Sequence, residues 1–381
     1  MQTKRCKIHL IAGARPNVMK IAPLYKVLKG QAWCEPKLVF IAQHYSENMS
    51  SDLFAQFGVH DEITVLPLDA DNYGDRMGGI IKGYSEFIQQ DDPDMVIVPG
   101  DVDVALGAAL SARRLHRTLV HLEAGLRSYD ATMPEEMNRV LIDSIADVLL
   151  APSAAAAQNL LYHEGVPHSR VHFVGNIMID ALAMVLDPKA ADEVSARLDV
   201  EAGEFAVATF HRPANVDNAE RLDEIRKLLG HVAGLLPVVF PVHPRTLERL
   251  KRLPGGEALF NDPRIRTSPP LSYVEFANLV ARSRLVITDS GGIQEEASWL
   301  GVPCFTLRDT TERPITITHG TNTLVDFDDV RLQIQPVIDR VATPRTIDLP
   351  LWDGRTAGRV VQVLRTKWKA GYADAARRIG A

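Results

Sequence analysis

Short apolar runs alternate along the chain with longer stretches in which apolar positions recur every three to four residues. The first run, residues 7–12, ends at Gly13 and precedes the helical spacing of Ile21, Leu24 and Leu28. Runs of the same kind occupy residues 94–98, 118–122, 148–151 and 171–174. Apolar runs that alternate with amphipathic helices are typical of βαβ units, so this half of the chain predicts a parallel sheet.

The same pattern restarts after a charged stretch at residues 187–203. The predicted strands of the second half are residues 205–209, 237–241, 285–288 and 302–307, and its predicted helices are 218–235, 293–300 and 356–369. We therefore predict an α/β fold of two Rossmann-like domains with a cleft between them. The expected domains are residues 1–176 and 177–355, and residues 356–381 are expected to form a helix that packs back on the first domain.

Composition and charge exclude several classes of function. The 381 residues carry a formal net charge of −6, and Lys and Arg are scattered, so we expect no nucleic-acid partner. No apolar run approaches the roughly 20 residues that span a bilayer, and the polar start of the chain does not resemble a signal peptide. Cys6, Cys34 and Cys304 are too dispersed for a zinc cluster or a disulfide framework. We expect a cytoplasmic protein without metal, cofactor or membrane contact.

The most specific motif is the string DSGGIQEEA at residues 289–297, where a predicted strand meets a helix. Gly291 and Gly292 let the backbone approach a ligand closely, and the N-terminus of a helix favours phosphate. Ser290 adds a hydroxyl donor, and Glu296 can accept hydrogen bonds from both hydroxyls of a ribose. For a bare Ser-Gly-Gly the alternative is a turn in which Ser290 only caps the helix. The complete string favours a nucleotide site.

Charged residues follow the predicted strands of the first half. Arg15 and Lys20 come after the first strand, where they hold a diphosphate or balance a carboxylate, unless they are ordinary surface cations. Further acids and a base follow on neighbouring loops: Asp101, Glu123, Glu135, Glu136 and Arg139. Carboxylates forced together acquire different pKa values, so one is protonated while another is ionised. This arrangement is typical of acid–base catalysis.

Histidines and one further arginine follow strands of the second half. His211 and His243 end two of its strands, on the same edge as the Ser-Gly-Gly string. A histidine at a strand end is otherwise structural or merely exposed, and the sequence has no His-Glu-x-x-His or cysteine pattern that would indicate a metal. Arg313 lies in the string RDTTERP at residues 308–314, which is rich in hydrogen-bonding groups. A solvated loop is the alternative interpretation of that string.

Together these strings resemble the non-hydrolysing UDP-N-acetylglucosamine 2-epimerase family over nearly the whole chain. The most specific are TDSGGIQEEA and DTTERP, and the supporting ones are GARPNVMKIAP, AQH, GD, HLEAGLRS, PEEMNR, FHR and PVHP. The resemblance implies the glycosyltransferase-B architecture, with the sugar acted on by the first domain and UDP bound by the second. It also implies a reaction in which UDP is eliminated across C1–C2 of the sugar and added back to the other face.

The resemblance assigns roles to the residues singled out above. The positions that it marks as catalytic are Asp101, Glu123, Glu135 and His211. Those expected to bind substrate are Arg15, Lys20, Arg139, His243, Ser290, Gly291, Gly292, Glu296 and Arg313. Gln43 and His44, with His243, match positions at which some bacterial members bind a second UDP-N-acetylglucosamine as an allosteric activator. We expect a UDP-sugar substrate and a homodimer.

The match to the family is uneven. The usual Gly-Thr-Arg-Pro-Glu ends in Asn17 here, the usual Gly-Asp-Thr-Thr ends in Val102-Asp103, and Pro213-Ala214 replace a basic or small residue and an acid. Each exchange alters a polar group that we expect to face the sugar, while the nucleotide strings are intact. The pattern therefore indicates UDP and leaves the sugar open.

We expect an isomerase that inverts C2 of a UDP-N-acetylated sugar, as in conversion of UDP-N-acetylglucosamine to UDP-N-acetylmannosamine. One carboxylate takes the C2 proton and another acid returns a proton to the opposite face, with base and acid unassigned among Asp101, Glu123 and Glu135. Three alternatives stay open. They are a C2 epimerase of a UDP-2,3-diacetamido sugar or its uronic acid, a hydrolysing 2-epimerase that releases free N-acetylmannosamine and UDP, and a glycosyltransferase of the same fold. A transferase would need an acceptor site and would leave the carboxylates idle.

Overall fold

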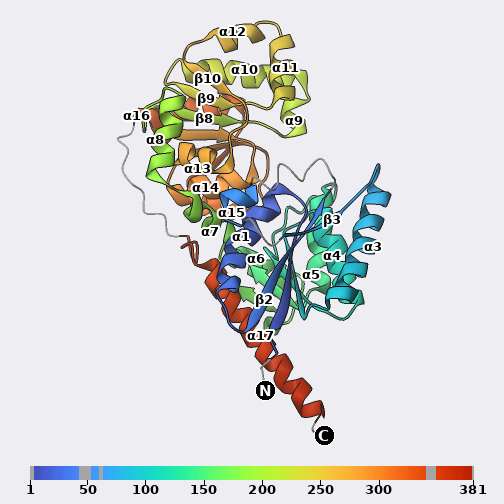
Figure 1. The fold of residues 1–381 in the computed structure, drawn as a ribbon. Coiled ribbons are helices and arrows are strands. Elements are labelled where there is room, and N and C mark those ends of the chain that lie inside the picture. The colour runs from blue at the N-terminus through green and yellow to red at the C-terminus, as the bar shows by residue number, and fades with distance from the viewer. Residues whose placement is uncertain (1–3, 43–52, 60–62, 340–348, 380–381) are drawn as a thin grey trace. The chain divides into compact units, whose positions relative to one another are not determined.

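The computed structural model describes residues 4–42, 53–59, 63–339 and 349–379. Gln43 and His44, predicted to bind an activator, lie outside these residues. The chain forms two compact units, Met1–Met184 with Pro350–Ala381, and Val185–Leu349. Figure 1 gives the course of the chain through each of them. None of the helices in the described part combines the length and the apolar character that crossing a bilayer requires.

The first unit is built on a parallel sheet, which in the described residues has the order β3-β2-β1-β4-β5-β6-β7. Its strands are β1 (Cys6–Ala12), β2 (Cys34–Ala42), β3 (Ile63–Pro67), β4 (Met95–Pro99), β5 (Thr118–Leu122), β6 (Val148–Ala151) and β7 (Val171–Phe173). The order 3-2-1-4-5-6 is that of the Rossmann fold, in which ligands bind where the strand order reverses. In this unit the reversal lies between β1 and β4.

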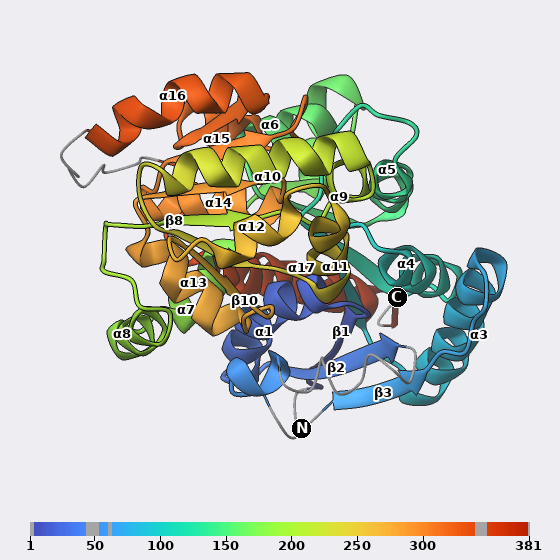
Figure 2. The same ribbon diagram turned by 90° about the horizontal axis from the view of Figure 1, so that it is seen from above.

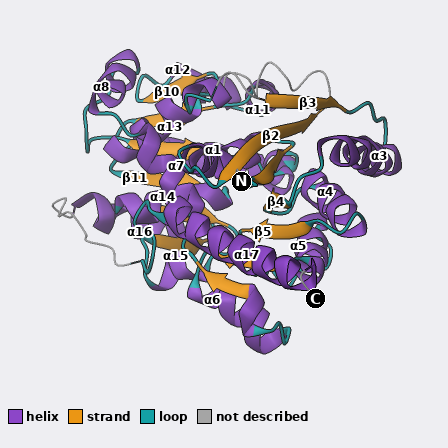
Figure 3. Cartoon of the chain, turned by 60° about the horizontal axis from the view of Figure 1, so that its bottom comes forward, coloured by secondary structure: helices purple, strands orange, loops and turns teal. Residues whose placement is uncertain are grey.

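Helices cover this sheet because its central strands are apolar on both faces, with every residue of β4 and β6 buried. Figures 2 and 3 show the helices around the strands. They are α1 (Arg15–Lys29), α3 (Tyr73–Asp91), α4 (Asp103–Arg114), α5 (Pro134–Ile145), α6 (Ala154–Gln158) and α7 (Ile177–Val185). Helix α4 packs closely against α3, since a Cβ at Gly107 would lie 2.5 Å from Cγ2 of Ile80.

The second unit repeats the same plan. Its sheet has the order β10-β9-β8-β11-β12-β13 in the described residues, which is again 3-2-1-4-5-6 along the chain. The strands are β8 (Ala206–Thr209), β9 (Val238–Pro241), β10 (Ile265–Ser268), β11 (Leu285–Thr288), β12 (Cys304–Leu307) and β13 (Asn322–Val325). The strand order reverses between β8 and β11. The predicted fold of two Rossmann-like domains is confirmed.

Helices of the second unit pack on both sides of its sheet, over two apolar clusters. They are α8 (Pro188–Arg197), α9 (Pro213–Val216), α10 (Ala219–Ala233), α11 (Pro244–Arg252), α12 (Gly256–Asn261), α13 (Tyr273–Arg282), α14 (Gly291–Leu300), α15 (Pro314–Thr318) and α16 (Phe327–Asp339). Helix α14 follows β11 directly, so its N-terminus stands at the point where the strand order reverses.

The last segment of the chain returns to the first unit, where α17 (Thr356–Ile379) packs against α1 (Figure 1). The carboxylate of Asp180 in α7 accepts hydrogen bonds from the N–H groups of Thr356 (3.0 Å) and Ala357 (2.8 Å). The indole N–H of Trp352 donates to the carbonyl of Pro152 at 3.1 Å. The chain leaves the first unit after α7 and not at residue 176, because these contacts tie α7 to the returning segment.

Candidate active site

The predicted site residues gather at the two places where the strand order reverses. In the first unit they follow β1, β4 and β5, and we call this group the carboxylate site: Lys20, Asp101, Glu123, Glu135 and Arg139. In the second unit they follow β8, β11 and β12, and we call them the Ser-Gly-Gly site: His211, Ser290, Gly291, Gly292, Glu296 and Arg313. Parallel strands present their carboxyl ends on one edge, which is why loops far apart in the sequence meet there.

Lys20 and Glu123 form a buried ion pair in the carboxylate site. Gly100, with φ of +67°, packs directly over the pair, because a Cβ there would lie 2.5 Å from Nζ of Lys20 and 3.2 Å from Oε2 of Glu123. Glu123 itself has φ of +77°, a left-handed backbone conformation that is costly for a side-chain-bearing residue. Lys20 is therefore the counter-ion of a carboxylate and not a surface cation.

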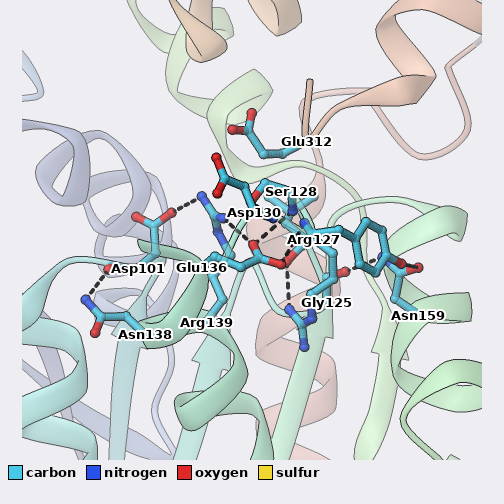
Figure 4. A network of polar contacts seen from close by, with 12 residues as sticks. Asp101, Gly125, Arg127, Ser128, Asp130, Glu136, Asn138, Arg139, Asn159 and Glu312 are labelled. Carbon is cyan, nitrogen blue, oxygen red and sulfur yellow. Dashed lines mark hydrogen bonds and ion pairs between the residues drawn. The ribbon is translucent and has the colours of Figure 1, made fainter. Parts of the chain in front are cut away.

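Arg139 joins two acids of the same site (Figure 4). Its Nη2 lies 2.6 Å from Oδ2 of Asp101 and its Nη1 lies 2.8 Å from Oε2 of Glu136. Glu136 also accepts hydrogen bonds from the N–H groups of Ser128 (2.9 Å) and Tyr129 (3.0 Å). Burial alone would raise the pKa of Glu136, but these backbone donors and Arg139 lower it. Glu136 is thus an ionised anchor, which leaves Asp101 and Glu135 as the carboxylates open to a ligand.

Asp101 and Glu135 line one pocket of about 510 Å³ in the first unit. Glu135 is exposed, in contrast to its buried neighbour Glu136. The amide of Asn138 spans the pocket wall, donating to the carbonyl of Asp101 (2.8 Å) and to Oδ1 of Asp103 (3.3 Å). The other lining residues are Tyr73, Arg76, Val102, Ala131, Thr132, Met133, Pro134 and Met137. Two acids on opposite sides of a bound carbon could invert it, because one can take a proton from the carbon and the other can return a proton to the opposite face.

The residues that depart from the family pattern do not share one environment. Val102 and Asp103 line the pocket, as expected of groups that face a sugar. The expectation that Asn17 faces the sugar is wrong, because this side chain is buried and forms hydrogen bonds within the protein. Its Oδ1 accepts from the N–H groups of Gly13 (3.2 Å) and Ala14 (3.1 Å), and its amide donates to the carbonyl of Pro99 (3.1 Å). Asn17 ties the carboxyl ends of β1 and β4 together.

A buried network behind the carboxylate site was not predicted from the sequence. His121, the last residue but one of β5, contacts Asp143 of α5 through Nδ1 and the carbonyl of Gly100 through Nε2. Asp143 also accepts from Arg127 at 2.7 Å. Burial would raise the pKa of Asp143, but its contacts with His121 and Arg127 hold that pKa below its ordinary value. Polar residues spaced three and four apart along α5, Glu136, Arg139 and Asp143, are the sequence signal that marks this inward face.

The Ser-Gly-Gly site begins at the N-terminus of α14. Ser290 occupies the N-cap position, but its hydroxyl makes no capping hydrogen bond, so the alternative in which it only caps the helix is not supported. A Cβ at Gly291 would lie 2.7 Å from Nη1 of Arg313, so this glycine makes room for the arginine. No described atom lies within 4 Å of the corresponding point at Gly292, which faces open space. The helix end is therefore accessible at Gly292, as a phosphate site requires.

Arginines crowd around this helix end. Arg308 Nη2 lies 2.8 Å from Oε1 of Glu312, and Arg313 contacts Oε2 of the same carboxylate at 3.2 Å and Oε1 of Glu295 at 3.1 Å. Burial would raise the pKa of Glu312, but the two arginines lower it to about 2. The pKa of Arg212 is lowered by burial and by repulsion from Arg308. Cations that repel one another at a helix N-terminus are well suited to hold a diphosphate.

His211 is held by the residue that precedes Ser290. Its Nδ1 lies 2.8 Å from Oδ1 of the buried Asp289, while the ring is 59% exposed. Asp289 also accepts from the N–H groups of His211 (3.1 Å) and Arg212 (3.0 Å) and from the amide of Asn215 (3.0 Å). Burial would raise the pKa of Asp289, and these donors lower it instead. Because Nδ1 donates to the carboxylate, Nε2 is the ring nitrogen presented to solvent.

Glu296 is buried further along α14. The hydroxyl of Tyr273, which the sequence analysis missed, donates to its Oε1 at 3.0 Å. Burial raises the pKa of Glu296 to about 7, an effect that the Tyr273 hydrogen bond opposes and Glu295 reinforces. Tyr273 belongs to no motif; it is the first residue of α13, between Ser272 and Glu275 of the capping box.

The remaining predicted residues lie at strand ends with simpler surroundings. Arg15 begins α1 just beyond β1. His243, exposed beyond β9, caps α11 by accepting from the N–H of Arg245 at 3.3 Å. Across the described ranges no group of three or more His, Cys, Asp or Glu side chains is arranged to hold a metal ion.

Comparisons with known proteins find relatives over most of the chain. The sequence model of the UDP-N-acetylglucosamine 2-epimerase family matches residues 26–365. A UDP-N-acetylglucosamine 2-epimerase of Methanocaldococcus jannaschii is 36% identical over 363 residues, covering 94% of this chain and 98% of the relative. A UDP-2,3-diacetamido-2,3-dideoxy-D-glucuronate 2-epimerase of Pseudomonas aeruginosa is also 36% identical, over 322 residues, covering 84% and 88%.

The fold matches as well. The crystal structure of the Methanocaldococcus jannaschii UDP-GlcNAc 2-epimerase in complex with UDP-GlcNAc and UDP superimposes with a TM-score of 0.82 at 34% identity. The match covers 94% of this chain and 99% of that structure. The chain therefore belongs to the UDP-N-acetylglucosamine 2-epimerase family.

Proposed function

We propose that this protein inverts C2 of a UDP-N-acetylated sugar, of the UDP-N-acetylglucosamine to UDP-N-acetylmannosamine type, by eliminating UDP and adding it back. One observation carries the proposal: Asp101 and Glu135 line a single pocket of the first unit, while the second unit offers an arginine-rich helix end. A relative with 34% identity has been crystallised with UDP-GlcNAc and UDP, which supports a UDP-sugar as the substrate.

In the proposed reaction the Ser-Gly-Gly site takes the nucleotide. The N–H groups at the start of α14, the Ser290 hydroxyl and Arg313 bind the diphosphate, and Glu296 accepts from the ribose hydroxyls. His211 presents Nε2 from a ring fixed by Asp289. These donors stabilise UDP as a leaving group because charge develops on its phosphate when the C1–O bond breaks.

The carboxylate site then handles the proton on C2. A C2 hydrogen beside no carbonyl is only weakly acidic, so its removal accompanies or follows the loss of UDP. One carboxylate takes the proton, the electrons of the C2–H bond form the C1=C2 double bond, and UDP leaves with the electrons of the C1–O bond. Return of a proton to the opposite face of C2, with UDP adding to C1, gives the epimer.

Incubation with UDP-N-acetylglucosamine in deuterated water tests this chemistry. Elimination and re-addition exchange the C2 hydrogen with solvent, so the product should carry deuterium at C2 by NMR. Retention of the original hydrogen would contradict the proposal. The same spectra separate the two outcomes of elimination: UDP-linked product supports the non-hydrolysing reaction, and free N-acetylmannosamine with UDP supports the hydrolysing one.

A second substrate has a specific observation in its favour. Val102 and Asp103, where this chain departs from the family pattern, line the pocket beside Asp101. The Pseudomonas aeruginosa relative named for a diacetamido uronic acid sugar is as similar in sequence as the archaeal one, at 36% identity. The deuterium assay should therefore include a UDP-2,3-diacetamido sugar and its uronic acid, compared by kcat/KM.

We further infer that the protein is a homodimer. Helices α4 and α5 pack together and carry exposed large apolar side chains: Leu110, Met137, Val140 and Leu141. Side chains of this kind on adjacent helices are typical of a subunit interface. Light scattering should give twice the chain mass of 42.0 kDa, and a monomer at micromolar concentration would contradict the inference.

A further inference from the structure

We propose that His121 is a positioning residue for proton transfer: through Asp143 it joins the loop that carries Asp101 to the turn that carries Glu123, and so fixes the two carboxylates relative to each other. This inference rests on the proposed function, since Asp101 lines the pocket proposed to hold the sugar and Glu123 belongs to the same carboxylate site. His121 itself has no access to a ligand, because its side chain is 0% exposed.

Both ring nitrogens of His121 face acceptors. Nδ1 lies 2.5 Å from Oδ1 of Asp143, and Nε2 lies 2.9 Å from the carbonyl oxygen of Gly100. A carboxylate and a carbonyl can only accept, so each nitrogen must donate a hydrogen. The ring therefore bridges the two acceptors, with one nitrogen on each of them.

Asp143 extends the bridge to the second loop. Its Oδ2 accepts from the N–H of Gly125 at 3.0 Å and from Nη2 of Arg127 at 2.7 Å. Arg127 in turn pairs with Glu164 through two contacts of 2.6 and 2.9 Å. Both oxygens of the buried Asp143 thus have partners, His121 on one of them and Gly125 and Arg127 on the other.

The two ends of the bridge are backbone groups adjacent to the carboxylates. Gly100 precedes Asp101 and packs over the Lys20–Glu123 pair, while Gly125 closes the turn that Glu123 begins. Glu123 is in a strained left-handed conformation, which persists only where its surroundings enforce it. Loss of the bond to Gly100 lets the Asp101 loop shift, and a displacement of about 1 Å in a reacting group can cost about 100-fold in rate.

A second buried histidine in the same unit supplies a control. His9 also pairs with an aspartate, with Nε2 at 2.7 Å from Asp91 and Nδ1 at 3.1 Å from the hydroxyl of Tyr84. Its partners belong to α3 and none of them is in the carboxylate site. His9→Asn should therefore lower the melting temperature while kcat stays that of the wild type.

The test compares two substitutions at His121. In His121→Gln the amide nitrogen takes the place of Nε2 and keeps the bond to Gly100, whereas in His121→Asn it takes the place of Nδ1 and keeps only the bond to Asp143. Each variant loses one contact, so both should lose melting temperature. Only His121→Asn should lose kcat, by about 10- to 100-fold on the UDP-sugar that the wild type turns over. KM, and the Kd of UDP by calorimetry, should stay within about 2-fold, because the nucleotide groups belong to the other unit.

Wild-type kcat in His121→Asn, or equal losses of kcat in both variants, would overturn the positioning role, because the bond to Gly100 would then not set the rate. If His121→Asn does not fold, Asp143→Asn replaces it: without its charged partner the ring can turn from Gly100, and the same loss of kcat at constant KM is expected. Wild-type kcat there would overturn the proposal. A wild-type enzyme that epimerises no UDP-sugar would instead refute the proposed function itself, and the positioning role with it.

Discussion

Each unit of this protein places a histidine beside a buried aspartate at its ligand edge, but the two pairs differ in exposure. In the first unit both ring nitrogens of His121 are used inside the protein, and the ring is sealed. In the second unit one nitrogen of His211 is held by Asp289, and the ring is 59% exposed. The same pair of side chains can thus have a structural or a catalytic role. The role depends on whether the second ring nitrogen of the histidine can reach the ligand.

The comparison extends to the carboxylates of the two units. Glu136 of the first unit is held ionised by Arg139 and backbone donors, whereas Glu296 of the second is buried beside Glu295 and has a raised pKa. In the first unit Asp101 and Glu135 line the pocket, and Arg139 joins Asp101 to the ionised Glu136. In the second unit Arg308 and Arg313 pair with Glu312, and Arg313 lies beside Gly291 at the start of α14, where we propose that the diphosphate binds. The following variants test this division, starting with the largest expected effect.

Neutralising the open acids should have the largest effect on turnover. Asp101→Asn and Glu135→Gln remove a proton carrier with little change of shape, so kcat should fall by about 10²- to 10⁴-fold. Calorimetry should give a Kd for UDP close to that of the wild type, because the nucleotide groups are in the second unit. Because Glu135 is exposed, Glu135→Gln should keep its melting temperature. Wild-type turnover in both variants would refute the catalytic assignment.

Loss of the open histidine should come next. His211→Asn keeps a donor toward Asp289 but removes Nε2, so we expect a loss of about 100-fold in kcat. The melting temperature should change little, since the ring is largely exposed. This is the reverse of the expected effect at His9, where stability falls and turnover does not. A His211→Asn variant with a lower melting temperature and the kcat of the wild type would contradict the proposed difference between the two histidine–aspartate pairs.

Gly292→Ala tests the helix end without disturbing the protein. The new methyl group would meet no described atom, so the fold should tolerate it. It would occupy the space of the phosphate, and loss of one or two charged hydrogen bonds should weaken UDP binding by about 10- to 100-fold in calorimetry. Gly230→Ala, in α10 and equally unobstructed, is the matched control and should bind UDP normally. Normal binding by both variants would place the phosphate elsewhere.

The raised pKa of Glu296 makes stability depend on pH. The folded protein holds this proton up to about pH 7, against the ordinary value of 4.5, so its stabilising contribution is complete below pH 4.5 and is lost as the pH rises to 7. The loss amounts to about 3 kcal/mol. The free energy of unfolding should be measured by urea unfolding for the wild type and for Glu296→Gln, at intervals from pH 4.5 to 8. It should fall with rising pH by this amount more in the wild type than in the variant. Parallel curves would mean that Glu296 is ionised throughout.

The smallest effects are expected at the residues that depart from the family pattern. Asn17→Glu would bury a carboxylate and break the bond to the Pro99 carbonyl, so it should destabilise the fold by about 1–3 kcal/mol in urea unfolding. Asp103→Thr changes a pocket wall, so stability should hold within about 0.5 kcal/mol. The ratio of kcat/KM between N-acetylglucosamine and diacetamido substrates should shift a few-fold in Asp103→Thr. No shift in this ratio would mean that the residue at position 103 does not help the pocket to discriminate between these sugars.

The sequence predicts the central strands and misses β2, β3, β10 and β13. In β2 the polar or turn-forming residues Glu35, Pro36 and Lys37 stand before its buried apolar run, residues 38–42, and obscure the start of the strand. Much of β3 is partly exposed, so it gives no clean apolar run. Apolar periodicity detects burial on both faces, and strands nearer the edge of a sheet are buried less completely.

Some residues of the candidate site could also be predicted from the sequence, and others could not. Residues of the motifs, such as Ser290 and Asp101, were predicted because a string in the sequence marks them. Their partners come from distant parts of the chain: Asp143 lies 22 residues from His121, and Asp289 lies 78 from His211. No local pattern encodes such a pair; only the order of the strands brings its members together.

The return of the chain to the first unit has a consequence for biosynthesis. The second unit is an uninterrupted stretch, Val185–Leu349, and has all of its own contacts as soon as it leaves the ribosome. The first unit is made earlier but cannot complete its contacts until the segment from Pro350 onward is translated. Until then Asp180 and the Pro152 carbonyl lack the hydrogen bonds that this segment donates to them. The half made first is thus the last to be finished.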